Sequence, residues 1–290
     1  MNQSEIFIRK PAVAGPRGFY PSDPATLKEA INEYLSGAQK VSESKPLGLI
    51  APHAGYVYSG PVAGWAYRQL AGWKYDTVVV LAPSHSEFFS FASIMAQGRY
   101  QTPLGDIEVD GKFGERLAQA SGGAAQLSLE GHHAPTGVRE EHSLEVQLPF
   151  LQVVLGDFKL VPVVIGAIGW DLCRNLGLAL AEVGRGSDVL IVASSDLSHY
   201  HGYDEACRLD SQVIRRIEQL DAQGLAEGCR SRKLEACGGV PIAALMVAAE
   251  QAGAGEVRIL RHATSGDIPA GERDYVVGYL AAAFYRSAKV

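Results

Sequence analysis

Short apolar runs alternate with amphipathic segments along most of the chain. Three of the runs are rich in Val, Ile, Leu and Ala and lie at residues 47–51, 77–82 and 189–193. Continuous apolar runs of this length are typical of strands that are covered on both faces of a parallel sheet. These runs therefore predict the centre of an α/β sheet.

Each of these runs is followed by side chains that can bind a metal or transfer a proton. His53 follows the first run, His85 follows the second, and Asp196 and His199 follow the third. The carboxyl ends of strands face the ligand crevice in open α/β sheets, so we expect these side chains to lie together. A lone histidine is more often a satisfied core residue, and the repetition is what favours a shared site.

An amphipathic pattern predicts a covering helix at residues 25–35, and further helices are expected at 62–70, 171–183, 203–220 and 241–251. The strand, loop, helix and strand at residues 47–82 form a unit that implies parallel pairing. Another strand is expected at 160–165, in a less central place because Pro162 lacks an amide proton. The run at 275–279 is also strand-like, and short peripheral strands are expected at 93–96 and 107–109.

No linker divides the chain. Its 290 residues, 47% of them hydrophobic, can bury a large core. We therefore predict one α/β domain over residues 1–290, with a central, largely parallel or mixed sheet flanked by helices. Residues 121–137 have loop composition, and their adjacent His132 and His133 are expected to be solvated.

Composition narrows the possible partners and compartment. A net charge of −6 with scattered basic residues gives no footprint for nucleic acid or anionic lipid. No segment approaches the roughly 20 apolar residues of a membrane helix, and the first residues lack a signal-peptide pattern. Four cysteines without a C-x-x-C spacing fit a reducing compartment. We expect a cytoplasmic protein with no nucleic-acid or membrane partner.

Two further segments carry candidate chemistry. An apolar-periodic helix is expected from about Ser143, and His142 and Glu145, three positions apart, can face the same way at its start. That spacing suits a proton-transfer pair or support for a metal ligand, whereas an acid-rich helix cap is the alternative. Cys237 lies in a glycine loop before the helix at 241–251, where helix amides can lower the pKa of a thiol, and the alternative is a packed thiol.

Together these motifs resemble the Memo family, also described as protein B of the AmmeMemoRadiSam system. The shared stretches extend over nearly the whole chain and are Ala14-Gly15, Phe19-Tyr20-Pro21, Ala51-Pro52-His53-Ala54-Gly55-Tyr56, Pro83-Ser84-His85, Glu141-His142-Ser143-Leu144-Glu145, Ser194-Ser195-Asp196-Leu197-Ser198-His199 and Cys237-Gly238. The family is similar in fold to class III extradiol ring-cleavage dioxygenases, which bind non-haem Fe(II) through two histidines and a carboxylate. The resemblance implies a metal held by His53, His85 and Cys237, with three catalytic residues beside it: His199, Asp196 and His142.

The implied ligand set departs from the dioxygenases, because a thiolate replaces the carboxylate. Two imidazoles and a thiolate disfavour Mg²⁺ and Ca²⁺ but suit iron, copper and zinc alike. Zinc would indicate hydrolysis, since it lowers the pKa of bound water to about 7, whereas iron or copper would indicate redox chemistry. The resemblance favours Fe(II), with copper or zinc as alternatives.

Three functions are compatible with these features. The first is a Memo-family, dioxygenase-like oxidoreductase that uses non-haem iron or copper. The second is a non-catalytic adaptor for phosphotyrosine-type peptides, or a metal carrier. The third is a partner subunit for AMMECR1-like and radical SAM proteins in a modification system. Proton-transferring residues beside the ligands favour catalysis, whereas a phosphopeptide reader should show an Arg cluster near the motifs.

Overall fold

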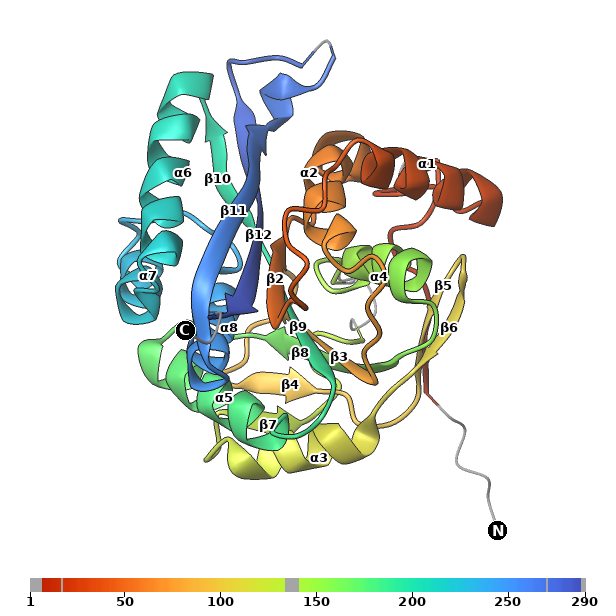
Figure 1. The fold of residues 1–290 in the computed structure, drawn as a ribbon, viewed down its shortest axis with the longest axis vertical. Helices are drawn as coiled ribbons and strands as arrows, with labels where there is room; N and C mark the ends of the chain where they lie inside the picture. The colour runs from red at the N-terminus through yellow and green to blue at the C-terminus, as the bar shows by residue number, and fades with distance from the viewer. Residues whose placement is uncertain (1–6, 17, 134–140, 270, 288–290) are drawn as a thin grey trace.

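A nine-stranded sheet forms the centre of the molecule, and helices lie on both of its faces (Figure 1). The computed structural model describes residues 7–16, 18–133, 141–269 and 271–287. The strands follow the order β10-β12-β2-β9-β3-β8-β4-β7, and β11 pairs with the other edge of β12. They are β2 (Gly48–Ala51), β3 (Thr77–Pro83), β4 (Ala92–Ile94), β7 (Ala125–Leu127), β8 (Lys159–Ile165), β9 (Val189–Ser194), β10 (Asp196–His201), β11 (Ala254–Thr264) and β12 (Val276–Arg286).

The middle of the sheet is parallel, and strands toward both sides run antiparallel to it. β2, β9, β3 and β8 pair in parallel, whereas β12 pairs antiparallel with β2, and β4 pairs antiparallel with β8. Every residue of β2 and β3 is buried, as their continuous apolar runs predict. The predicted α/β fold with a mixed sheet flanked by helices is confirmed.

The two faces of the sheet contribute to two separate hydrophobic clusters. Val78 and Val80 of β3 pack with one group of helices, while Val79 and Leu81 pack with the other, because successive strand side chains point to opposite faces. The first group comprises α1 (Pro24–Ser36), α2 (Tyr56–Arg68) and α4 (Leu148–Leu155), with the short 3₁₀ helix η1 (Glu145–Gln147) before α4. The second comprises α3 (Gly111–Ala120), α5 (Trp170–Val183), α6 (Tyr203–Glu218), α7 (Ala222–Arg230) and α8 (Gly239–Gln251).

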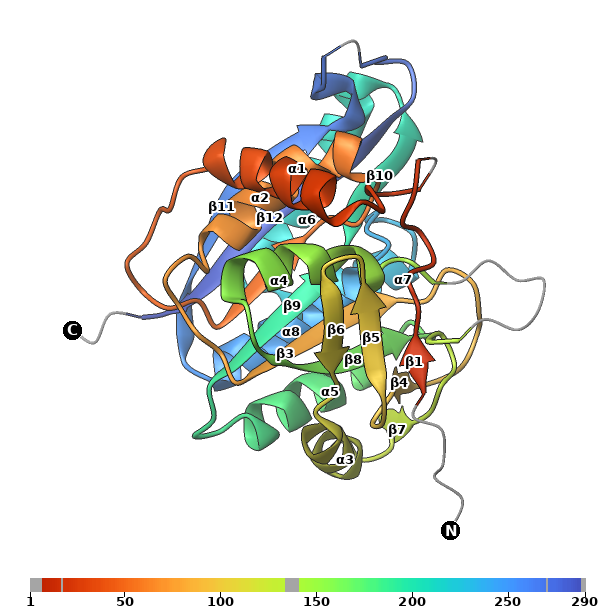
Figure 2. The ribbon, with the colours of Figure 1, turned by 90° about the vertical axis from the view of Figure 1, so that its right-hand side faces the viewer.

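A smaller three-stranded sheet is formed by β1, β5 and β6. Its strands are β1 (Ile8–Arg9), β5 (Arg99–Thr102) and β6 (Gly105–Glu108), and a second 3₁₀ helix, η2 (Ser265–Asp267), follows β11. Figure 2 shows this sheet beside α4, where Thr102 Oγ1 donates to Gln152 Oε1. The N-terminal arm, which extends from β1 to Tyr20, is attached to this sheet because β1 pairs in parallel with β5.

Several expectations about individual elements are wrong. β8 is interior, between β3 and β4; its pairs with β4 end at Val163, so Pro162 lies beyond the last of them. α2 already begins at Tyr56 and includes Pro61, whereas the sequence predicted a loop there. β10 and most of β11 and β12 were not expected as strands. β7 lies inside the loop expected at residues 121–137. Residues 134–137 of that loop lie outside the described residues.

The sheet divides at the carboxyl end of β2. β12 pairs with β11 along one edge, and its other edge pairs with β2 near Ala282 and with β10 near Tyr279. The chain leaves β9 at Ser194 and enters β10 at Asp196 at the point where β2 has ended. The side chains that follow β2, β3 and β9 lie at this division.

Candidate metal centre

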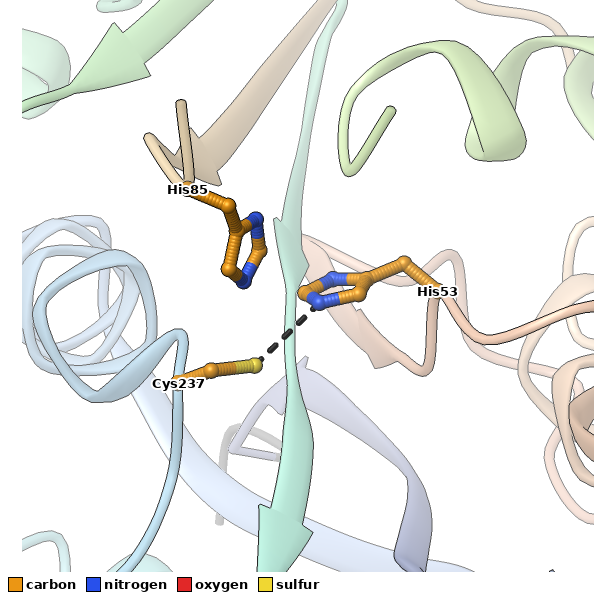
Figure 3. A group of neighbouring side chains, drawn as sticks. All are labelled: His53, His85 and Cys237. Carbon is orange, nitrogen blue, oxygen red and sulfur yellow. Dashed lines mark hydrogen bonds between the residues drawn. The ribbon is translucent and has the colours of Figure 1, made fainter. Parts of the chain in front are cut away.

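Three side chains from different parts of the chain converge at this division (Figure 3). His53 follows β2, His85 follows β3, and Cys237 lies between α7 and α8. One donor atom from each lies within 4.8 Å of the other two, and the centroids of the imidazole rings are 5.2 Å apart. Donors that each lie about 2.0 to 2.3 Å from one ion have comparable spacings. The structure thus brings the three predicted ligands together, and their role as ligands stays a prediction.

His53 is the buried member of this group, with only 2% of its surface exposed. Its backbone N–H donates to Asp196 Oδ1 at 2.8 Å, and its Nδ1 lies 2.8 Å from Ser194 Oγ. The hydroxyl of Ser194 donates its only proton to the carbonyl of Ser143, so it accepts from His53 Nδ1–H. The lone pair of His53 Nε2 is therefore directed toward Cys237, whose Sγ is 3.2 Å away.

Further buried polar groups fix the position of Ser194. Gln147 Nε2 donates to Ser194 Oγ at 2.7 Å and to the Pro52 carbonyl at 3.0 Å. Gln147 Oε1 accepts from the hydroxyl of Tyr67 at 2.6 Å. These buried neutral hydrogen bonds favour the proton of His53 on Nδ1.

His85 is more exposed and has a charged partner. Its side chain is 35% exposed, and its Nδ1 lies 3.0 Å from Glu141 Oε1. Burial alone would raise the pKa of Glu141, but the hydrogen bond and charge of His85, together with His142, hold that pKa well below its usual range. Glu141 is therefore a buried carboxylate anion. The sequence analysis did not identify its role, although it stands directly before His142 in a quoted motif.

Asp196 lies beside His53 and Cys237. Its Oδ1 accepts the backbone N–H of His53, and its Oδ2 is 4.0 Å from His53 Nε2. Burial raises the pKa of Asp196 to about 7, against the hydrogen bonds from the His53 and Ala54 amides, which lower it. The carboxyl can therefore exchange a proton near neutral pH.

His199 lies on β10 close enough to His53 and His85 for their charges to interact. Its Nδ1–H donates to the carbonyl of Leu197 at 2.8 Å, which leaves Nε2 as the acceptor in the neutral ring. Burial lowers the pKa of His199. The next residue, Tyr200, is 72% exposed. Its backbone φ of 63° is unusual for a residue other than glycine.

His142 completes the cluster of rings. Its ring stacks on His85 at 4.9 Å between centroids and lies 5.5 Å from His53. Phe19 packs against the ring of His142, with 4.6 Å between the ring centroids.

The expected pair of His142 with Glu145 is wrong. Glu145 is buried and turned to the N-terminal arm, where it accepts from the amides of Ala12 and Val13 and from the Tyr20 hydroxyl. Glu141 is the carboxylate beside His142 instead, with 3.5 Å between Oε1 and the His142 Nδ1. The reason is that the segment starts as a 3₁₀ helix at Glu145, so His142 precedes the helix and does not share its face.

The expected lowering of the Cys237 pKa is also wrong. Desolvation and the nearby charge of Asp196 raise the pKa of the thiol well above its usual range, against hydrogen bonds that lower it. Gly238 lets the loop approach β9, because a Cβ there would lie 2.1 Å from the carbonyl oxygen of Ser194. A cation must therefore displace the thiol proton before sulfur can bind it.

His132 and His133, the adjacent histidines of the expected loop, lie outside this site. His132 is 1% exposed rather than solvated, because Tyr100 Oη lies 2.6 Å from its Nδ1 and the Ser93 carbonyl lies 3.1 Å from its Nε2. The ring of His133 packs edge-on against Phe7. Neither histidine belongs to the groups of possible metal ligands among the described residues.

The fold and the site together define an α/β protein with a possible metal centre of histidine and cysteine at the carboxyl edge of its sheet. Sequence comparison specifies the family. The profile of the Memo-like protein family matches residues 9–283, and the chain belongs to that family. This confirms the resemblance inferred from the motifs.

Relatives of similar length occur in archaea. A MEMO1 family protein of Pyrobaculum arsenaticum is 38% identical over 290 residues, covering 96% of this chain and 99% of the relative. A MEMO1 family protein of Methanopyrus kandleri is 39% identical over 290 residues with the same coverage. A crystal structure of an uncharacterized protein of Escherichia coli K12 is similar in fold alone, with a TM-score of 0.52 and 13% identity over 81% of this chain and 99% of that one.

Among the helices that the structure describes, none combines the length and apolar character needed to cross a bilayer.

Proposed function

We propose that this Memo-family chain is a metal-dependent oxidoreductase that binds non-haem Fe(II) through His53, His85 and Cys237. The observation that carries this proposal is the convergence of two imidazoles and one thiol, with donor atoms within 4.8 Å of one another. The hydrogen bonds at Nδ1 of both histidines leave Nε2 as the donor atom. Soft sulfur and imidazole ligands fit iron, copper or zinc, and Fe(II) is preferred on the resemblance to dioxygenases.

The surrounding residues fit catalysis better than simple storage. Bound iron would supply redox and Lewis-acid chemistry. Asp196 holds a proton near neutral pH, while His199 and His142 are imidazoles near the ligands that can accept or donate protons to a substrate. Phe19 adds an apolar contact to the ring of His142. We expect the substrate to be a small molecule or a peptide.

A non-catalytic peptide-binding protein is the second candidate. Exposed aromatic side chains favour it: Tyr58 and Tyr200 are 49% and 72% exposed, and both lie near enough to Tyr279 to influence its pKa. Aromatic side chains are common at binding surfaces. A partner role beside AMMECR1-like and radical SAM proteins also stays a prediction.

Metal analysis of protein purified without oxygen tests the proposal. We expect about one equivalent of iron per chain after reconstitution with Fe(II), and oxygen-dependent change in the spectrum of the loaded protein. Parallel titrations with Cu(I) and Zn(II) rank the alternatives. Failure to bind any of the three ions stoichiometrically under reducing conditions would refute the proposal and favour the metal-free binding protein.

A further inference from the structure

Glu141 contacts two of the four imidazoles at the site, and no other described carboxylate does so. We propose that Glu141 is a shared positioning residue that keeps the protons of His85 and His142 on Nδ1, so that Nε2 of each ring carries the lone pair. This inference rests on the proposed metal-binding function for the role of His85, but its structural part can be tested without metal.

The carboxylate of Glu141 is held rigidly among hydrogen-bond donors. It accepts the backbone N–H groups of His85, His142 and Ser143, the last two at 2.9 Å. Its side chain is only 1% exposed. Backbone amides from two separate segments therefore fix the carboxylate, and the rings must adjust to it.

The same oxygen of this carboxylate faces both rings. Glu141 Oε1 lies 3.0 Å from Nδ1 of His85 and 3.5 Å from Nδ1 of His142. The two rings are stacked, with 24° between their planes. An anionic oxygen attracts an N–H and repels a lone pair, so it favours the Nδ1–H form of each ring.

The two rings then have different tasks. His85 Nε2 belongs to the group that can hold the metal, and its hydrogen bond to a carboxylate makes the imidazole a stronger electron donor. His142 belongs to a second group of possible ligands, with His85 and Glu141, rather than to the group formed with His53 and Cys237, and its ring is near both histidines. A neutral imidazole with its proton on Nδ1 can accept a proton at Nε2.

Histidine tautomers of metal-free, ¹⁵N-labelled protein provide the first test, since long-range ¹H–¹⁵N NMR spectra distinguish Nδ1–H from Nε2–H. We expect Nδ1–H for His85 and His142 in the wild type, and a shift toward Nε2–H in both rings of Glu141→Ala. Glu141→Gln keeps an acceptor oxygen but loses the charge, so a smaller shift is expected. It also serves as the second variant if Glu141→Ala does not fold.

The matched control is Glu145→Gln, which changes a buried carboxylate four residues away that fastens the N-terminal arm. We expect it to lower thermal stability and leave both tautomers unchanged. Unchanged tautomers in Glu141→Ala and Glu141→Gln, or the same shift in Glu145→Gln, would overturn the proposal.

Metal affinity is the second readout. Removing a group that orients a metal-bound histidine typically weakens binding about 10- to 100-fold, so Zn(II) competition titrations should show such a loss in Glu141→Ala and none in Glu145→Gln. Equal affinity of wild type and Glu141→Ala would contradict the link to the ligand. If the wild type binds no metal, the proposed function fails, while the tautomers still decide the role of Glu141.

Discussion

His53 and His85 reach the same point from strands on either side of β9, but their surroundings differ. His53 is 2% exposed and is held by the neutral hydroxyl of Ser194, whereas the His85 side chain is 35% exposed and is held by the anion of Glu141. Both partners leave Nε2 as the donor atom. Only the carboxylate also adds negative charge, so the two halves of one site should respond differently to substitution.

The largest effect is expected when either half loses its ligand. His53→Ala, His85→Ala and Cys237→Ser each leave two of three protein donors, and each should nearly abolish binding of Fe(II), Cu(I) and Zn(II) in anaerobic titrations. Melting curves distinguish a lost ligand from a lost fold. Tight binding by Cys237→Ser would move Asp196 or His199 into the ligand set and remove Cys237 from it.

His132 lies outside the site, and its hydrogen-bond partners, Tyr100 and the Ser93 carbonyl, are neutral. His132 is buried, and burial lowers its pKa to about 4, so it stays neutral in the folded protein at a pH where the unfolded chain is protonated. Its contribution to stability is therefore present above pH 6.5 and lost as pH falls toward 4, by about 3 kcal/mol in total.

Urea denaturation at pH 7 and pH 5 measures this dependence. The free energy of unfolding should fall by about 2 kcal/mol more in wild type than in His132→Gln, whose amide does not titrate. The comparison with the variant removes the contributions of other groups, including His53, whose pKa burial also lowers. An equal fall in both proteins would show that His132 is solvated, as the sequence suggested.

Substitution of Asp196 or His199, which lie beside the ligands, should weaken metal binding less than substitution of a ligand. Asp196→Asn and His199→Ala are expected to weaken metal affinity by only about 10- to 100-fold, because these groups orient and tune the ligands. Any turnover should fall further than affinity, since both groups can transfer protons. Loss of affinity as large as that of His85→Ala would identify either residue as a ligand.

The strands and their chemistry could be predicted because the information is local. Apolar runs that end in His53, His85 and Asp196 define both the sheet and the edge where side chains gather. Amphipathic periodicity similarly located α1, and the helices expected at 171–183 and 241–251 correspond to α5 and α8. These features depend on residues within one element, so a single sequence contains them.

The remaining features depend on contacts between distant segments. Glu141 and Glu145 belong to one acidic motif, but their partners are His85 and the arm at residues 12–20, which nothing in the local pattern indicates. The pKa of Cys237 likewise depends on burial and on Asp196, which outweigh the adjacent helix. β10 has no continuous apolar run and becomes a strand by pairing with β12.

The smallest effect is expected for the neutral partner of His53. Ser194→Ala removes the acceptor for His53 Nδ1–H and for Gln147 Nε2, but the carboxylate of Asp196 still fixes the His53 backbone. Because no charge is lost, we expect the weakening of metal affinity to stay near the lower limit of about 10-fold, less than in Glu141→Ala. Two unsatisfied buried donors should also cost about 1 to 3 kcal/mol each in stability.

Ser121→Ala is the matched control for this last prediction, because Ser121 is a buried serine at the C-terminal end of α3 whose Oγ forms hydrogen bonds with the backbone of Ala118 and Ala125. It should lower stability and leave Zn(II) affinity unchanged. A loss of affinity in Ser194→Ala that equals or exceeds the loss in Glu141→Ala would show that orientation, rather than charge, determines ligand strength at both histidines. The distinction between the two halves of the site would then be one of exposure alone.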